Sequence, residues 1–111
     1  MAFKAAFLAH APDANPSKHN CVIETPHSYK LFVYIVKNQK QAVEVCKKLV
    51  EEEEIHSILL CPGFKHQDVA EISDAVGDCV GVSVARGDGA SNRISLEVMK
   101  REGWFKEKGN K

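Results

Sequence analysis

Residues 61–66 read CPGFKH and place a thiol and an imidazole within six residues, directly after the apolar run IHSILL. A cysteine that precedes a helix N-terminus can act as a nucleophile, with a nearby histidine as its base. Cys61 and His66 are therefore candidate catalytic residues. The alternative is structural: Cys61 ends a buried strand, residues 62–63 turn the chain, Phe64 packs, and His66 lies in solvent.

A second cluster, RGDG at residues 86–89, carries an arginine and an aspartate. Arg86 could clamp a carboxylate or phosphate in bidentate fashion, and Asp88 could be a base or a turn former before glycine. Gly63 and the free amides of the helix after it could also hold an anion. The alternative for Arg86 and Asp88 is an ion pair that shapes a turn.

Several chemistries lack their usual spacing. The chain has neither G-x-x-x-x-G-K-[ST] nor G-x-G-x-x-G, so we expect no nucleotide cofactor. No pair of histidines is spaced H-x-H or H-x-x-x-H, so we expect no metal site. Lys37 could form a Schiff base only if it were desolvated, and its place before a helix cap favours solvent. The residues of metal-ligand type are His10, Asp13, His19, His27, Cys61 and His66.

The hydrophobic pattern predicts the elements that carry these residues. Strands are expected at 3–9, 29–36, 57–61 and 80–85, where apolar residues alternate or run continuously. Helices are expected from Asn38, which begins a capping-box pattern, and across 69–76, ended by Gly77. The segment 21–27 is ambiguous, residues 86–92 read as a loop, and composition favours helix over strand for 94–102.

Four glutamates at 51–54 should fray the end of the first helix, because carboxylates oppose the negative end of a helix dipole.

The order of elements predicts an α/β fold: a single domain over residues 1–111 with a mostly parallel four-stranded sheet built from consecutive βαβ units. A C-terminal helix or fifth strand follows, and residues 106–111 form a charged, frayed tail. Ligands of open α/β sheets bind at the carboxyl ends of the strands. The expected ligand-binding residues at this rim are His10, Gly63, Phe64, His66, Arg86 and Asp88.

If both crossover helices cover one face of the sheet, something else must close the other face. The candidates are the C-terminal segment with Trp104 and Phe105, the long loop after the first strand, or a second subunit, and we expect a homodimer. The formal net charge of zero argues against a nucleic-acid partner. The chain has no long apolar run and no signal-peptide pattern, so we expect no membrane partner and a cytoplasmic location.

Residues 3–89 resemble a family of small prokaryotic proteins of unknown function. The matching stretches are KAAFLAHAPDANPSKHNCVIETP, VKNQKQAVEVCKKLVEE, LLCPGFKH and AEISDAVGDCVGVSVARGDG. The most specific pieces are His19, ETP at residues 24–26, Gly63-Phe64-x-His66 and Arg86-x-Asp88-Gly89. The resemblance implies a parallel α/β pattern and brings no established activity with it.

The sequence therefore favours a small cytosolic α/β protein that binds a small anionic metabolite at the carboxyl rim of its sheet. One alternative is an enzyme of lyase, isomerase or hydrolase type that uses Cys61, His66 or Asp88. The other is a structural or subunit-interaction protein without a ligand. The residues leave open whether the chain is an enzyme.

Overall fold

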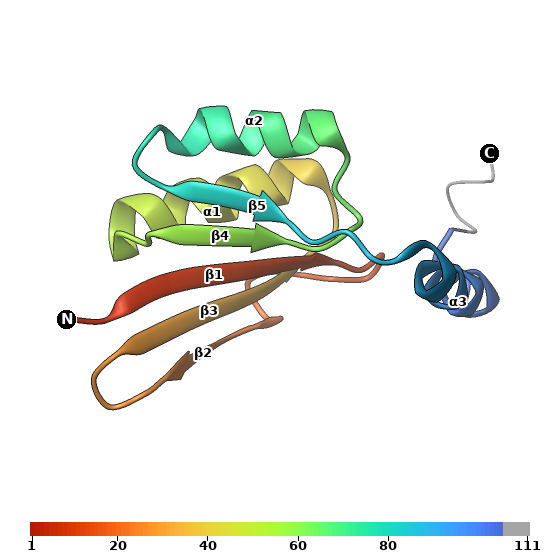
Figure 1. Cartoon of the computed structure of the whole chain (residues 1–111), viewed down its shortest axis with the longest axis horizontal. Coiled ribbons are helices and arrows are strands. Elements are labelled where there is room, and N and C mark those ends of the chain that lie inside the picture. The colour runs from red at the N-terminus through yellow and green to blue at the C-terminus, as the bar shows by residue number, and fades with distance from the viewer. Residues whose placement is uncertain (106–111) are drawn as a thin grey trace.

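The computed structural model describes residues 1–105, and its elements form one sheet with helices on one side (Figure 1). Five strands lie in the order β2-β3-β1-β4-β5, and all neighbours are parallel except β2 and β3. Two of the three helices connect parallel strands. The elements are β1 (Phe3–His10), β2 (Asn20–Glu24), β3 (Tyr29–Val36), α1 (Gln39–Glu53), β4 (Ser57–Leu60), α2 (His66–Val76), β5 (Gly81–Val84) and α3 (Gly89–Arg101).

The α/β class is confirmed, but the prediction of four strands is wrong. The ambiguous segment after the first loop forms β2, an exposed edge strand that pairs antiparallel with β3. An edge strand needs little apolar burial, and its own sequence is exposed throughout, so it carries no strong hydrophobic pattern. The predicted charged tail at 106–111 lies outside the described residues.

The core lies between the sheet and the layer formed by α1 and α2 (Figure 1). Leu8, Ile58 and Leu60 extend from the sheet and are completely buried, as is Ile72 of α2. Strands β1 and β4 each have a neighbour on both sides, and their helix-facing positions in the middle of the sheet, Ala6, Leu8, Ile58 and Leu60, are apolar and buried. Each described helix is too short or too polar to cross a lipid bilayer.

Helix α1 begins as predicted, because the Asn38 side chain accepts from the amide of Gln41 at 2.9 Å. The Gln41 side chain reaches back one residue further than the usual capping box, to the amide of Lys37 at 2.8 Å. The predicted fraying at 51–54 is wrong: the helix runs to Glu53, and Glu54 takes a left-handed conformation with φ 56°.

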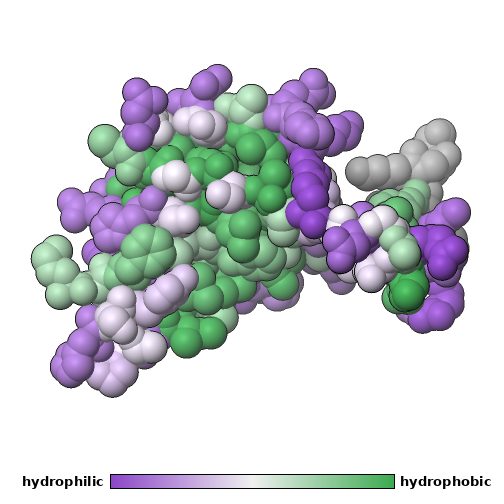
Figure 2. Space-filling view, viewed as in Figure 1, coloured by the Kyte–Doolittle hydropathy of each residue, from purple (hydrophilic) through white to green (hydrophobic). Residues whose placement is uncertain are grey.

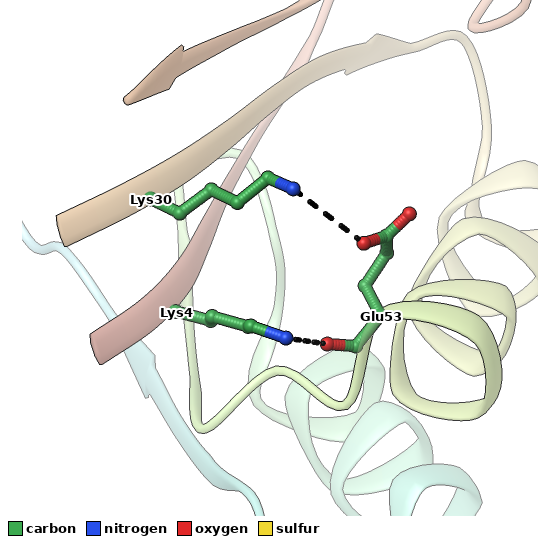
Figure 3. A network of polar contacts seen from close by, with 3 residues as sticks. All are labelled: Lys4, Lys30 and Glu53. Carbon is green, nitrogen blue, oxygen red and sulfur yellow. Dashed lines mark hydrogen bonds and ion pairs between the residues drawn. The ribbon is translucent and has the colours of Figure 1, made fainter. Parts of the chain in front are cut away.

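Two lysines from the sheet explain why the acidic end of α1 stays helical (Figure 3). The ammonium of Lys4 in β1 donates to the carbonyl oxygen of Glu53 at 2.9 Å. The ammonium of Lys30 in β3 lies 3.9 Å from the Glu53 carboxylate. Cations at a helix C-terminus satisfy free carbonyls and offset the dipole, so the sheet supplies what the helix sequence lacks.

The C-terminal segment is a helix, as composition predicted, and it begins earlier than expected, at Gly89 within the predicted loop. Helix α3 lies beyond the carboxyl end of the sheet and packs on neither face of it (Figure 1). No residue of α3 is buried. Trp104 and Phe105, expected to close the second face of the sheet, instead follow α3, and the Trp104 amide donates to Met99 of that helix at 3.0 Å.

Candidate functional site

The carboxyl ends of β1, β4 and β5 form one continuous rim. Backbone bonds extend the sheet just past the strands: the Cys61 amide donates to Leu8 at 3.0 Å, and the Ala85 amide donates to Leu60 at 2.8 Å. His10, Cys61 and Arg86 therefore leave the sheet at the same edge. The sequence prediction placed these residues together by topology alone, and the strand order brings β1 and β4 side by side.

The turn after β4 is built around Phe64 and Gly63. The Phe64 amide donates to the Cys61 carbonyl at 3.3 Å, and the Phe64 ring is fully buried. The imidazole of His10 stacks on this ring, with centroids 4.1 Å apart and planes 21° apart. The buried Phe64 ring thus anchors the turn in the core and fixes the orientation of the His10 imidazole.

Gly63 lies so close to its neighbours that a side chain would crowd them. A Cβ atom there would be 3.1 Å from Nδ1 of His10 and 3.5 Å from Sγ of Cys61. The imidazole and the thiol therefore flank the same point of the turn. The absence of a side chain at Gly63 therefore lets the His10 imidazole and the Cys61 thiol approach the turn closely.

Arg86 joins the turn to the end of β5. Its Nη1 atom donates to the carbonyl oxygen of Pro62 at 3.2 Å, while the side chain remains exposed. This contact confirms the expectation that Arg86 lies beside Gly63. Guanidinium groups carry five N–H donors, so one bond to Pro62 leaves donors for a further partner.

The N-terminus of α2 opens on the same turn. The Lys65 amide donates to the Asp68 carboxylate at 2.9 Å, which closes the first turn of the helix. The amides of residues 66–68 are first-turn amides, which have no partner within a helix. Together with the positive end of the helix dipole, they favour an anion.

His66 and Asp88 take peripheral positions. His66 is the first residue of α2 and is exposed, and Asp88 is exposed at the start of α3, where its carbonyl accepts from Asn92 at 2.7 Å. Within residues 1–105, neither of these side chains forms an ion pair or a hydrogen bond. The expected ion pair between Arg86 and Asp88 is not formed, and Arg86 bonds to the Pro62 carbonyl instead.

The structure changes the catalytic hypothesis for Cys61. The imidazole beside the turn that holds Cys61 is that of His10, from the neighbouring strand, whereas His66 is the first residue of α2. His66 is the histidine nearest to Cys61 in the sequence, which is why it was the expected base. The signal that could have found His10 is its place at the end of β1, beside the end of β4 that Cys61 follows.

The other candidates have local roles. His19 accepts through Nδ1 from the amide of Asn15 at 2.9 Å, which orders the long loop after β1. Lys37 and Asp13 are exposed, and Asn38 caps α1. Among residues 1–105, no three His, Cys, Asp or Glu side chains gather as metal ligands.

One thiol has a strongly altered acidity, and it lies away from the rim. Burial of Cys46 in the core under α1 raises the pKa of its thiol from 9.0 to about 12. Cys46 therefore stays protonated in the folded protein at neutral pH, which is typical of an inert core cysteine.

The fold and the rim define a small α/β protein with a mostly parallel sheet, whose polar residues converge at the carboxyl ends of three strands. The chain belongs to DUF6506, a family of unknown function, whose pattern matches residues 3–100. No curated protein and no solved structure matches it.

Proposed function

We propose that the protein binds a small anionic metabolite at the rim, between Arg86 and the turn at residues 61–66. The contact between the Arg86 guanidinium and the Pro62 carbonyl is the observation that carries this proposal. It holds a permanent cation beside Gly63 and beside the N-terminus of α2. A carboxylate or phosphate in this position would accept from the guanidinium and from helix amides at once.

The neighbouring residues suit such a ligand. Gly63 offers a backbone without a side chain, and the His10 ring, fixed by stacking on Phe64, borders the same space. His66 and Lys65 add further donors at the start of α2. Arg86, Lys65 and His66 are all exposed, so the ligand would sit on an open surface and exchange readily with solvent.

The test is calorimetric titration of the full chain with inorganic phosphate and with a small dicarboxylate, at low ionic strength. Arg86→Gln removes the cation and should weaken binding about tenfold or more, since hydrogen bonds to charged groups contribute ~1.5–3 kcal/mol. The matched control is Arg93→Gln, which removes the same charge from exposed α3. Arg93→Gln should leave the affinity unchanged.

Equal weakening by both variants would mean that the anion responds only to overall charge, and the site would be rejected. If Arg86→Gln alone weakens binding, a thermal-shift screen of phosphorylated and carboxylated metabolites identifies the class of natural ligand, since a ligand that binds the native state raises the melting temperature.

A second candidate function, a subunit-interaction protein, is favoured by one separate observation. The face of the sheet opposite α1 and α2 is apolar and exposed. This surface is distinct from the rim, so binding at one does not exclude a role for the other.

A further inference from the structure

One face of the sheet has no covering layer in the described chain. Helices α1 and α2 both pack on the same side, and α3 lies beyond the end of the strands (Figure 1). Strand residues alternate between faces, so the residues that do not face the helices point outward together. We call this surface the open sheet face; its members are Phe3, Ala5, Phe7, Ala9, Cys21, Ile23, Tyr29, Leu31, Val33, Ile35, Ser57, Leu59, Gly81 and Ser83.

The strand register shows that the open sheet face carries no charge. Residues paired across the sheet share a face, and one row runs from Ile23 through Leu31 and Ala5 to Ser57 and Gly81. The charged strand residues Lys4, Glu24 and Lys30 pair with one another on the opposite face.

Large side chains on the open sheet face reach solvent. Ile23 is 59% exposed, Leu59 41% and Phe3 46%. A shallow depression of about 420 Å³ runs across the face, lined by residues that include Phe7, Tyr29 and Leu59. Hydrophobic side chains also gather over the strands in Figure 2. Contiguous apolar patches of this kind mark sites of association in soluble proteins.

Helix α3 is a second apolar surface without a partner in the described chain. Ile94 is 60% exposed and Val98 40%, and residues four apart share one side of a helix. Figure 2 shows some hydrophobic side chains among the hydrophilic ones on the lobe formed by this helix.

The linker before α3 has a contact near each of its ends. Arg86 bonds to the Pro62 carbonyl at 3.2 Å at the rim. At the start of the helix, the Asn92 side chain lies against Gly87, where a Cβ atom would be only 2.7 Å from Asn92 Oδ1. Helix α3 itself lies beyond the ends of the strands and has no buried residue (Figure 1).

The sizes of the two surfaces suit one interface. Five strands ~4.8 Å apart, with about five residues each at ~3.3 Å, present a face of roughly 400 Å². A helix of the length of α3 is about 20 Å long and ~10 Å wide, so it could cover only about half of that face. The open sheet face and one side of α3 together present roughly 600 Å², which is the lower limit of what each partner contributes to a specific interface, since such interfaces bury ~1,200 Å² or more in total. Neither surface reaches this limit alone.

We propose that the open sheet face and α3 together form a homodimer interface, and that the occupant is a second copy of this chain. The α3 arm of each copy lies on part of the open sheet face of its partner, and the remaining parts of the two open faces meet each other. An isologous contact brings the same surface from both copies together, so an uncharged apolar face suits it. The zero net charge of the chain means that two copies do not repel.

The test is the mass of the full chain in solution, measured by sedimentation equilibrium over a range of concentrations. The expected species has twice the 12.3 kDa of one chain. Leu59→Lys places a charge on the open sheet face and should weaken dimerisation at least a hundredfold. The matched control Val22→Lys adds the same charge at a 48% exposed position on the other face and should leave the dimer intact.

The arm is tested by Ile94→Lys against Ser95→Lys, both at exposed positions of α3. Ile94→Lys should shift the equilibrium toward monomer, and Ser95→Lys should not. Circular dichroism of each variant establishes that it is folded before its mass is interpreted.

A mixed sample decides between a partner's arm and a folded-back arm. One copy carries a spin label on α3 and the other carries ¹⁵N. Broadening of Phe7 and Leu59 amides in the ¹⁵N copy is the expected result. Three results would overturn the proposal. They are a monomer in which α3 lies on its own sheet, a monomer whose open sheet face is free, and a dimer whose dissociation constant is unchanged by Leu59→Lys.

Discussion

Gly63 is the residue on which the geometry of the rim depends most directly. Because Gly63 has no side chain, His10 and Cys61 can both approach the turn. A Cβ atom at Gly63 would lie 3.1 Å from Nδ1 of His10 and 3.5 Å from Sγ of Cys61. The buried ring of Phe64 fixes the plane of His10 by stacking. Cys61, the most conspicuous residue of the sequence motif, is partly buried at the end of the sheet ladder.

Cys46 gives a prediction about pH at the scale of one residue. Below pH 9.0 its thiol is protonated in both the folded and unfolded states. Between pH 9.0 and about 12 only the unfolded state loses the proton, because burial raises the folded-state pKa. Unfolding then releases a proton, so the free energy of unfolding falls as pH rises, by ~1.4 kcal/mol per unit at most.

The measurement is urea unfolding of the wild type and Cys46→Ala between pH 8 and 10.5. Lysines and tyrosines titrate in both proteins, so the difference between their pH slopes isolates Cys46. Equal pH slopes of the free energy of unfolding in the wild type and in Cys46→Ala would contradict the raised pKa of the Cys46 thiol.

Among the elements, α1 shows how the sheet completes a helix whose own sequence is unfavourable. Its last turn has no basic residue and ends in glutamates, yet the helix extends to Glu53. Lys4 and Lys30 of two adjacent strands meet this end from the sheet (Figure 3). The sequence rule about acidic helix ends failed here because the compensating charges are distant in the chain.

Replacement of Lys4 by methionine should lower the free energy of unfolding by about 1 kcal/mol, because it removes a cation and a donor from a helix C-terminus. Lys48→Met, on the exposed side of the same helix, is the control and should change stability by less than ~0.5 kcal/mol. Chemical denaturation measures both. A loss no larger for Lys4→Met than for Lys48→Met would show that the contact with Glu53 does not stabilise α1.

For the whole molecule, the sequence predicted what depends on local pattern. The limits of β3, the cap of α1 and the positive φ of Gly77 all follow from residues close in the chain. The strand β2 escaped prediction because an exposed edge strand buries nothing. The sequence placed His10 at the same rim as the Cys61 turn, but it did not predict that the imidazole beside Gly63 is that of His10, because such a contact depends on strand order, which short-range spacing does not contain.

The arrangement of α3 also belongs to the scale of the whole molecule. Composition predicted a helix, but a helix with no buried residue is positioned by its linker and by whatever it meets outside its own chain. The expectation that something must close the second face of the sheet rested on layer architecture, in which an apolar face is buried against another layer.

The central claim, an anion site at the rim, is tested most directly by ¹⁵N-resolved titration of the full chain with inorganic phosphate. We predict saturable shifts of the amides of Gly63, His66 and Gln67 and of the Arg86 side chain, with no change at Phe7 or Leu59 of the open sheet face. The claim would be contradicted if the shifts did not saturate or if they spread over exposed lysines. It would also be contradicted if the amides of Gly63 and of the first turn of α2 did not shift.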